Sequence, residues 1–160
     1  MTEDTVLHEE KAPFSLTLKW SLYLILLLLF VLTLRSWLDV SGGREGFWIL
    51  LIVTLFIVLV FQSFFNMRYS ITTEGVTAFM WPFSFSVRFE DIEDIYLAKP
   101  SFWVGWGMRM WWGRNIGYIS MHKVSVVIKK KKGFHRNFWL STLDSEGFRG
   151  MIEERMESQK

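Results

Sequence analysis

The sequence contains no cysteine and only three prolines among its 160 residues. Without cysteine there is no disulfide framework, no thiolate nucleophile and no zinc–thiolate site, which is compatible with a reducing compartment. The three histidines (His8, His122 and His135) lack the paired spacing of a zinc-protease helix, and neither a phosphate loop nor a dinucleotide fingerprint is present. The sequence therefore predicts a protein that is not an enzyme, with no catalytic residue, no metal site and no cofactor.

Charge is almost absent from two long stretches. Residues of about 18–35 contain Lys19 near their start, and residues 47–65 contain no charge over nineteen positions. At about 1.5 Å per residue, such a helix crosses a hydrocarbon core of roughly 30 Å. We expect a transmembrane hairpin over residues 16–65, with helices at about 18–35 and 47–65. A signal peptide is the alternative for the first stretch, but the acidic tail before it and the immediate second span argue against that.

The short connection over residues 36–46 makes the two predicted helices antiparallel, so both termini lie on one side. Positive residues near the helix ends slightly favour that side as the cytoplasmic one: Lys11, Lys19 and Arg68 against Arg35 and Arg44. The lysines at 129–132 add to it. We expect a multi-pass protein of the cell membrane with both termini in the cytoplasm. Residues 1–15, which lack apolar periodicity, are predicted to form a disordered tail.

The predicted spans also lack the groups that a transport pathway needs. Apart from Lys19 and Arg35 at the edges of the first span, they contain no Asp, Glu, Lys, Arg or His, and they contain no glycine or alanine to favour close helix dimerisation. This disfavours a channel or transporter, and we interpret the hairpin as an anchor.

Alternation with a period of two begins at Met67 and predicts a β-rich domain over residues 66–160. The segments Arg68–Thr72 and Val76–Phe79 flank a turn at Thr73–Gly75, and further strands are expected at Phe83–Phe89, at 124–128 and at 134–140. The chain is expected to close with a helix that begins near Ser141 and carries an apolar stripe. The acids between Glu90 and Asp94 are interspersed with aliphatic residues, so we interpret them as the solvent-facing side of a structured segment and not as a metal site.

Four motifs follow one another in a recognisable order: Ile71-Thr72-x-x-Gly75, Asp91-Ile92, Gly105-x-Gly107-Met108-Arg109 and Ser141-Thr142-x-Asp144. This order resembles the bacterial and archaeal pleckstrin-homology-like (PH-like) domains of small membrane proteins, over about Met67 to Glu157. The resemblance implies two packed antiparallel β-sheets forming a partly open barrel with a C-terminal capping helix, and it implies binding or scaffolding. The turn at Thr73–Gly75 lacks the clustered cations with which eukaryotic relatives hold phosphoinositides, so no lipid specificity is implied.

The stretch from Lys99 to Arg136 holds nine positive residues and no acid. We expect its basic side chains to contact lipid at the membrane surface: Arg109, Arg114, Lys129, Lys130, Lys131 and Lys132. We expect four aromatic side chains to contact the interface or a partner: Phe102, Trp103, Trp111 and Trp112. The alternatives are a solvated hairpin tip for the lysines and a core position for Trp106, Met108 and Met110.

These features together predict a non-enzymatic, membrane-anchored PH-like module that acts as a scaffold or interaction domain at the inner face of the membrane and contacts anionic lipid. The expected partners are membrane lipids and a protein. Interleaved basic and aromatic residues also occur on single-strand nucleic-acid binders, but the membrane tether favours lipid over nucleic acid. The alternative function is an accessory subunit of a larger membrane complex that docks through its Trp-rich loop.

Overall fold

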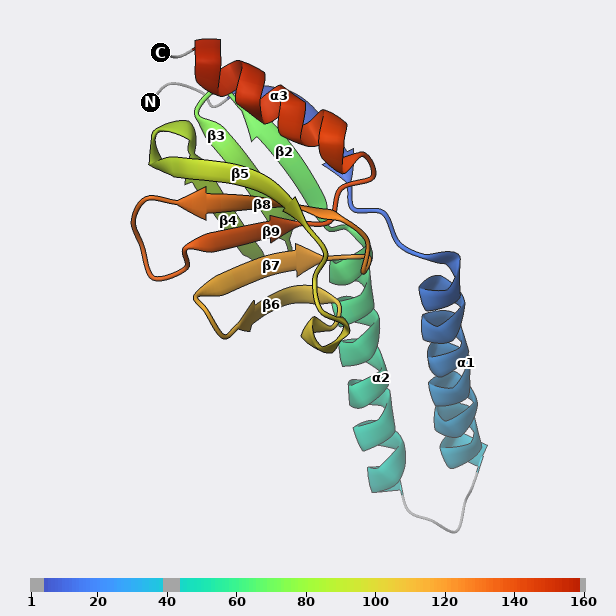
Figure 1. The fold of residues 1–160 in the computed structure, drawn as a ribbon. Coiled ribbons are helices and arrows are strands. Elements are labelled where there is room, and N and C mark those ends of the chain that lie inside the picture. The colour runs from blue at the N-terminus through green and yellow to red at the C-terminus, as the bar shows by residue number, and fades with distance from the viewer. Residues whose placement is uncertain (1–4, 39–43, 159–160) are drawn as a thin grey trace. The chain divides into compact units, whose positions relative to one another are not determined.

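The computed structural model describes residues 5–38 and 44–158, apart from the side chains of Arg44 and Phe102. The chain divides into a helical unit, Phe14–Phe65, and a globular unit made of Met1–Pro13 together with Asn66–Lys160 (Figure 1). The globular unit is therefore assembled from segments on both sides of the helices.

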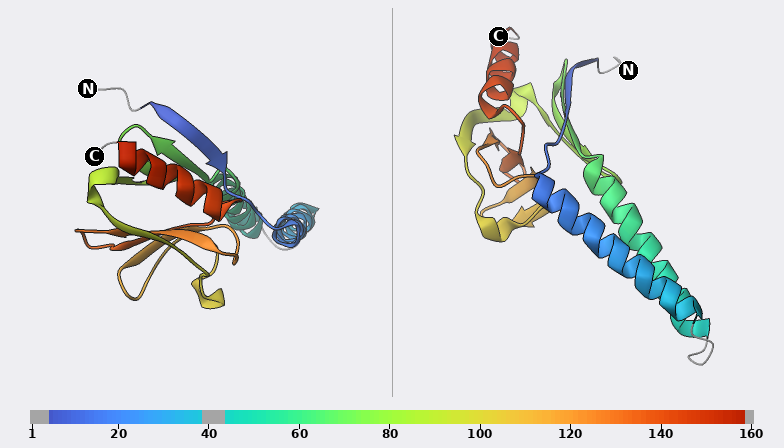
Figure 2. Two further views of the ribbon diagram at one scale, coloured as in Figure 1. Left: turned by 45° about the horizontal axis from the view of Figure 1, so that its top comes forward. Right: turned by 90° about the vertical axis from the view of Figure 1, so that its right-hand side faces the viewer.

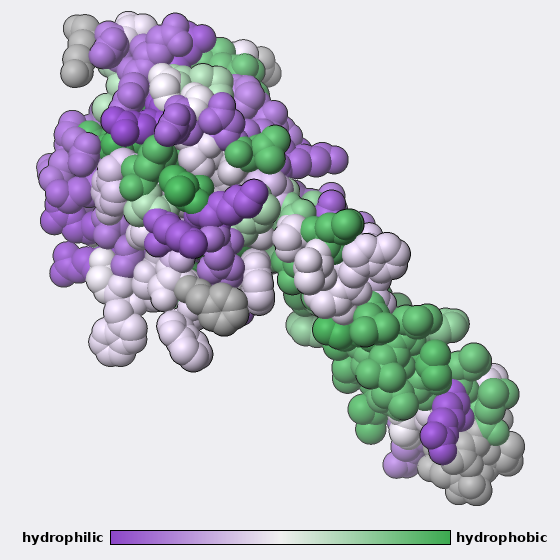
Figure 3. Space-filling view, turned by 45° about the vertical axis from the view of Figure 1, so that its right-hand side comes forward, coloured by the Kyte–Doolittle hydropathy of each residue, from purple (hydrophilic) through white to green (hydrophobic). Residues whose placement is uncertain are grey.

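Two helices form the helical unit, α1 (Leu16–Leu38) and α2 (Arg44–Phe65). Their most apolar stretches have mean hydropathies of 2.1 and 2.6, and both helices are long and apolar enough to cross a membrane. Hydrophobic side chains cover the visible face of the pair (Figure 3). The spans predicted at 18–35 and 47–65 lie inside these helices.

A threonine pair joins the two helices within their apolar part. The hydroxyls of Thr33 and Thr54 lie 3.2 Å apart, where one can donate to the other. Each also lies 2.8 Å from the carbonyl oxygen four residues earlier, that of Leu29 and that of Leu50. Bonding to the helix backbone satisfies a hydroxyl in an apolar setting, and the shared contact adds a polar link between the helices.

The first sheet contains β1 (Val6–Lys11), β2 (Arg68–Thr72), β3 (Gly75–Met80) and β4 (Phe83–Arg88), in that order and fully antiparallel. The predicted disordered tail is therefore wrong for β1, whose Lys11 pairs with Arg68. Its polar sequence suits an edge strand, and its partner follows only after the whole hairpin, so local periodicity does not reveal the pairing. The peptide bond between Trp81 and Pro82 is cis.

The second sheet contains β5 (Ile92–Ala98), β6 (Gly107–Trp111), β7 (Asn115–Ile119), β8 (Ser125–Lys130) and β9 (Asn137–Leu140). The strand order is β5-β8-β9-β7-β6, and β7 and β9 run parallel. The expectation of two wholly antiparallel sheets is therefore wrong for this one. The cause is the path of the chain: β9 turns back beside β8 and enters the space between β8 and β7. Short 3-10 helices, η1 (Phe89–Asp91) and η2 (Phe102–Val104), precede β5 and β6.

The sheets face one another, and helix α3 (Ser145–Ser158) lies along the open side between them (Figure 2). The Tyr69 hydroxyl on β2 donates a 2.8 Å hydrogen bond to the Tyr118 carbonyl on β7, and the rings of Phe85 and Phe138 lie 4.9 Å apart. Helix α3 contacts β5 and β8 and buries Phe148 and Ile152. These contacts form one core between the sheets.

Helix α3 begins later than predicted. The Asp144 carboxylate accepts a hydrogen bond from the Gly147 amide (3.0 Å), as an N-cap residue does. Ser141, the predicted start, is buried, and its hydroxyl lies 3.1 Å from that of Ser125 on β8. The polar residue that caps the helix is thus three positions beyond the one that the spacing suggested.

Candidate functional site

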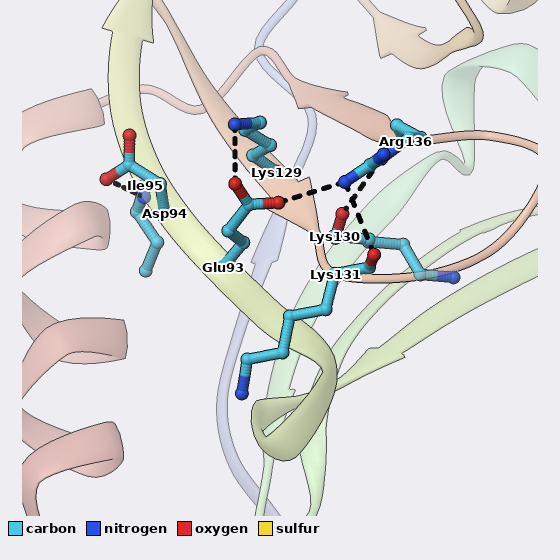
Figure 4. A network of polar contacts seen from close by, with 7 residues as sticks. All are labelled: Glu93, Asp94, Ile95, Lys129, Lys130, Lys131 and Arg136. Atoms are coloured by element: carbon cyan, nitrogen blue, oxygen red, sulfur yellow. Dashed lines mark hydrogen bonds and ion pairs between the residues drawn. The ribbon is translucent and has the colours of Figure 1, made fainter.

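The lysine turn at 129–132, between β8 and β9, is held by the carboxylate of one residue. Glu93 on β5 accepts hydrogen bonds from Lys129 (2.6 Å) and from Arg136 (3.1 Å), so it is held between two cations (Figure 4). The Lys129 ammonium, and then the Arg136 guanidinium, lower the pKa of this carboxylate below its ordinary value near 4.5. Two of the nine positive residues between Lys99 and Arg136 therefore form ion pairs with Glu93 within the domain.

The neighbouring lysines are also oriented by the domain. The Lys131 ammonium donates to the Glu90 carbonyl (2.7 Å), and the Lys130 ammonium lies 5.2 Å from the centre of the Phe85 ring. Lys132 is exposed. Of the four lysines predicted to meet lipid, three thus have contacts inside the domain.

The two predicted arginines belong to the edge hairpin formed by β6 and β7. Arg109 lies on β6 and donates to the Trp106 carbonyl (3.2 Å), while Arg114 occupies the turn with a φ of 60°. The Arg114 carbonyl accepts from the amides of Arg136 and Asn137, at 2.8 and 3.3 Å. The β6–β7 turn and the connection that begins with the lysine turn therefore lie side by side at one end of the second sheet.

The aromatic residues separate into two groups. Trp103 in η2 and Trp112 in the β6–β7 turn are 92% and 96% exposed. Trp111 is half-buried, because it packs across Gly117 against Trp139, with ring centres 5.6 Å apart. The side chain of Phe102 lies outside the described part of the structure. The side chains of Trp103 and Trp112 are thus exposed, whereas Trp111 packs on the outer face of the sheet.

The residues for which a core position was the alternative are only partly buried. Trp106 is 39% exposed and its ring meets that of His122 edge-on, with centres 5.1 Å apart. Met108 is half-buried, and Met110 is exposed. Met110 pairs with the buried Ile116 on β7, so it continues the apolar face of the sheet beyond the area that the core covers.

Exposed aromatic residues also occur at positions that the sequence pattern does not single out as contact sites. Trp81 and Phe83 lie at the β3–β4 turn, and Phe134 lies in the β8–β9 connection. Alternation in the sequence predicts strand-face positions for Phe83 and Phe134. The adjacent Pro82 is a signal that could have marked the first pair as a turn.

A shallow pocket lies where α3 begins. Its charged lining combines cations and acids: Lys99, Lys123, Asp144 and Glu146. Because both signs are represented, the lining does not favour a ligand of one charge. Among the described residues, no three His, Asp or Glu side chains gather closely enough to hold a metal ion.

Comparison with protein-family models, with curated proteins and with solved structures finds no significant match to this chain. The resemblance to PH-like domains accordingly stays a prediction made from the sequence motifs, and function has to be argued from the geometry of the chain itself.

Proposed function

We propose that the protein is a non-enzymatic, membrane-anchored interaction module. Helices α1 and α2 cross the membrane, and the globular unit, a PH-like domain, presents its loops to lipid and protein partners at the cytoplasmic face. The chemistry is that of binding, since exposed tryptophans and arginines are residues that dominate contact surfaces.

The observation that carries this proposal is the pairing of β1 with β2. These strands flank the helical hairpin in sequence, and the Ala12 amide donates to the Met67 carbonyl at 2.9 Å. A hydrogen-bonded sheet with charged loops lies on one side of a bilayer, so the chain has to leave and return on that side. An even number of crossings, as in a two-helix anchor, meets this requirement.

Two covalent connections hold the domain to this anchor, through Pro13 and through Asn66. Both are short, because β1 ends at Lys11 and α1 begins at Leu16, while α2 ends at Phe65 and β2 begins at Arg68. The domain is therefore kept at the membrane surface, where its effective concentration for surface-bound partners is high.

The absence of cysteine provides a direct test of this topology. We would introduce single cysteines by Leu38→Cys, at the end of α1, and by Glu154→Cys, exposed on α3. A membrane-impermeant maleimide should label the first in intact cells and the second only after permeabilisation. Labelling of Glu154→Cys in intact cells would contradict a cytoplasmic domain.

A second candidate function is that of an accessory subunit in a larger membrane complex, docking through the Trp-rich loop. The nearly complete exposure of Trp103 and Trp112 favours it. Purification from native membranes in mild detergent should then yield a partner in fixed stoichiometry. Recovery of the protein alone, at its monomeric mass, would count against this role.

A further inference from the structure

We propose that the globular unit rests on the lipid surface through an aromatic edge formed by Trp81, Phe83, Trp103, Met110 and Trp112, and not through the lysine turn at 129–132. The partner of this edge is the interfacial layer of an anionic bilayer. This inference rests on the membrane anchoring proposed above and specifies which surface makes the second contact.

The aromatic edge begins where the chain enters the first sheet. Both connections to the hairpin leave at the end of this sheet where Lys11 pairs with Arg68, and Arg68 pairs in turn with Phe79 on β3. The β3–β4 turn follows directly and carries the exposed side chains of Trp81 and Phe83. Apolar rings are thus presented at the tethered end of the first sheet.

Strand β6 lies on the same side of the domain. Figures 1 and 2 show β6 and η2 at the end of the globular unit where β2 begins, and α3 at the opposite end. Consistent with this, Tyr69, the second residue of β2, bonds to Tyr118 on β7, which is the strand next to β6. Bulky side chains near the middle of the hydropathy scale project from this end of the unit (Figure 3).

The residues of the edge have the chemistry of a membrane interface. Trp103 and Trp112 lie just before and just after β6, and Met110 is exposed between them. Tryptophan partitions into the headgroup layer because its ring is apolar while its indole N–H can still bond to water or lipid oxygen. Arg109 and Arg114, both exposed, add positive charge beside these rings, and their long side chains reach phosphate readily.

The charge of the surrounding chain complements an anionic surface. No Asp or Glu occurs between Lys99 and Arg136, so the loops around β6 place no carboxylate against headgroup phosphates. The lysine turn is a weaker candidate, because Lys129 is paired with Glu93 and Lys131 is bonded to the Glu90 carbonyl. Acids on η1 and β5 thus accompany that turn. The loops flanking β6 contain no acid of their own, although the β6–β7 turn lies beside the lysine turn through the Arg114 carbonyl.

We favour lipid over a protein partner because part of the aromatic edge lies near the connections to helices α1 and α2. The β3–β4 turn of this edge lies at the end of the first sheet from which both tethers leave, and each tether reaches its helix within a few residues. A protein partner would have to share this side with the bilayer surface. Lipid, in contrast, is present there at all times once the helices are inserted.

The test uses the full-length protein in nanodiscs of phosphatidylcholine and phosphatidylglycerol in equal parts. Single cysteines would be introduced at Ser101→Cys and Met110→Cys, near the aromatic edge, and at Lys132→Cys and Glu154→Cys as matched exposed controls. Each would carry an environment-sensitive fluorophore. A phospholipid with a doxyl quencher near the headgroup would report contact with the interface.

We expect a blue shift and loss of emission at positions 101 and 110, weaker changes at 132, whose turn lies beside the β6–β7 turn, and little of either at 154. The double change Trp103→Ser and Trp112→Ser should reduce the quenching at 110 while the circular dichroism of the domain is unchanged. Quenching at 132 equal to or above that at 110 would overturn the proposal, as would the absence of quenching at all four sites. Stable insertion into the nanodisc, read by size exclusion, reports the anchoring separately.

Discussion

The amide of Ala12 donates a 2.9 Å hydrogen bond to the carbonyl of Met67, although the entire helical hairpin separates the two residues in sequence. This bond extends the ladder between β1 and β2, in which Lys11 pairs with Arg68. The hairpin is therefore an insertion between two neighbouring strands of one sheet. The domain does not simply follow the helical hairpin, since its first sheet contains strands from both sides of it.

Replacing residues 14–65 by a short turn containing Asn-Gly should yield a soluble, folded domain. The two backbones are already adjacent, and Asn-Gly suits a tight connection between antiparallel strands. Cooperative thermal unfolding followed by circular dichroism, together with recovery in the soluble fraction, would check this outcome.

The matched comparison is the fragment 66–160, which lacks β1. Its β2 would become an exposed edge next to the buried side chains of Tyr69 and Ile71, so we expect lower stability and aggregation. If the fragment unfolded at the same temperature as the turn-linked domain, the proposed structural role of β1 would be wrong.

The change Tyr69→Phe should destabilise the domain by about 1–3 kcal/mol, because it removes the hydroxyl that bonds to the Tyr118 carbonyl within the core. Burial raises the pKa of the Tyr69 phenol, in keeping with a hydroxyl that stays neutral. Denaturant unfolding of the turn-linked domain would measure the loss.

Tyr118→Phe is the control for this change. Burial raises the pKa of Tyr118 to about 12, and its hydroxyl has no hydrogen-bond partner within the described part of the chain. Removing it should therefore leave stability unchanged or slightly higher. Equal losses for the two variants would show that the Tyr69 bond is not the source of the effect.

Glu93→Gln should loosen the turn between β8 and β9, because Lys129 and Arg136 lose the carboxylate that they share. Since the folded-state pKa of Glu93 lies below its ordinary value near 4.5, its contribution is fully present above pH 4.5. The contribution is lost as pH falls through the lower folded-state value. Amide hydrogen exchange of residues 129–136 should show this loss in the native protein on acidification.

In the Glu93→Gln variant, the protection of the amides of residues 129–136, relative to their intrinsic exchange rates, should be low and should not change with pH. Arg149→Gln, which breaks the exposed pair with Glu153 on α3, serves as the control and should leave exchange in the turn unchanged. If Glu93→Gln lost protection on acidification to the same extent as Arg149→Gln, a group other than Glu93 would control the turn.

Two glycine substitutions should have opposite effects. A Cβ at Gly75 would collide with the backbone of Val87 and Arg88 on β4, so Gly75→Ala should cost about 1–3 kcal/mol or more. A Cβ at Gly150 on α3 has no heavy atom within 4 Å beyond its own helix and chain neighbours, so Gly150→Ala should stabilise by about 0.5–1 kcal/mol. Midpoints of thermal unfolding would rank the two, and a destabilising Gly150→Ala would contradict the open space around α3.

The sequence by itself determined the features that depend on local pattern. A run of nineteen uncharged residues permits a membrane-length helix, and alternation at Arg68–Thr72 before Gly75 produces the hairpin of β2 and β3. The aromatic residues Trp103 and Trp112 stood out because they lie beside cations in a stretch without acids. Each of these signals is contained in a short window, where hydrophobic burial and turn geometry act between near neighbours.

Only the tertiary structure decided which distant segments meet. The residues of β1 look like a solvated tail until β2 supplies backbone partners, and the parallel pairing of β7 with β9 depends on where the chain turns back. Likewise, Lys129 is engaged because Glu93 faces it from another strand, and Trp111 is half-buried because Gly117 leaves room for its ring. These outcomes follow from contacts between residues remote in sequence, whose energies no local pattern contains.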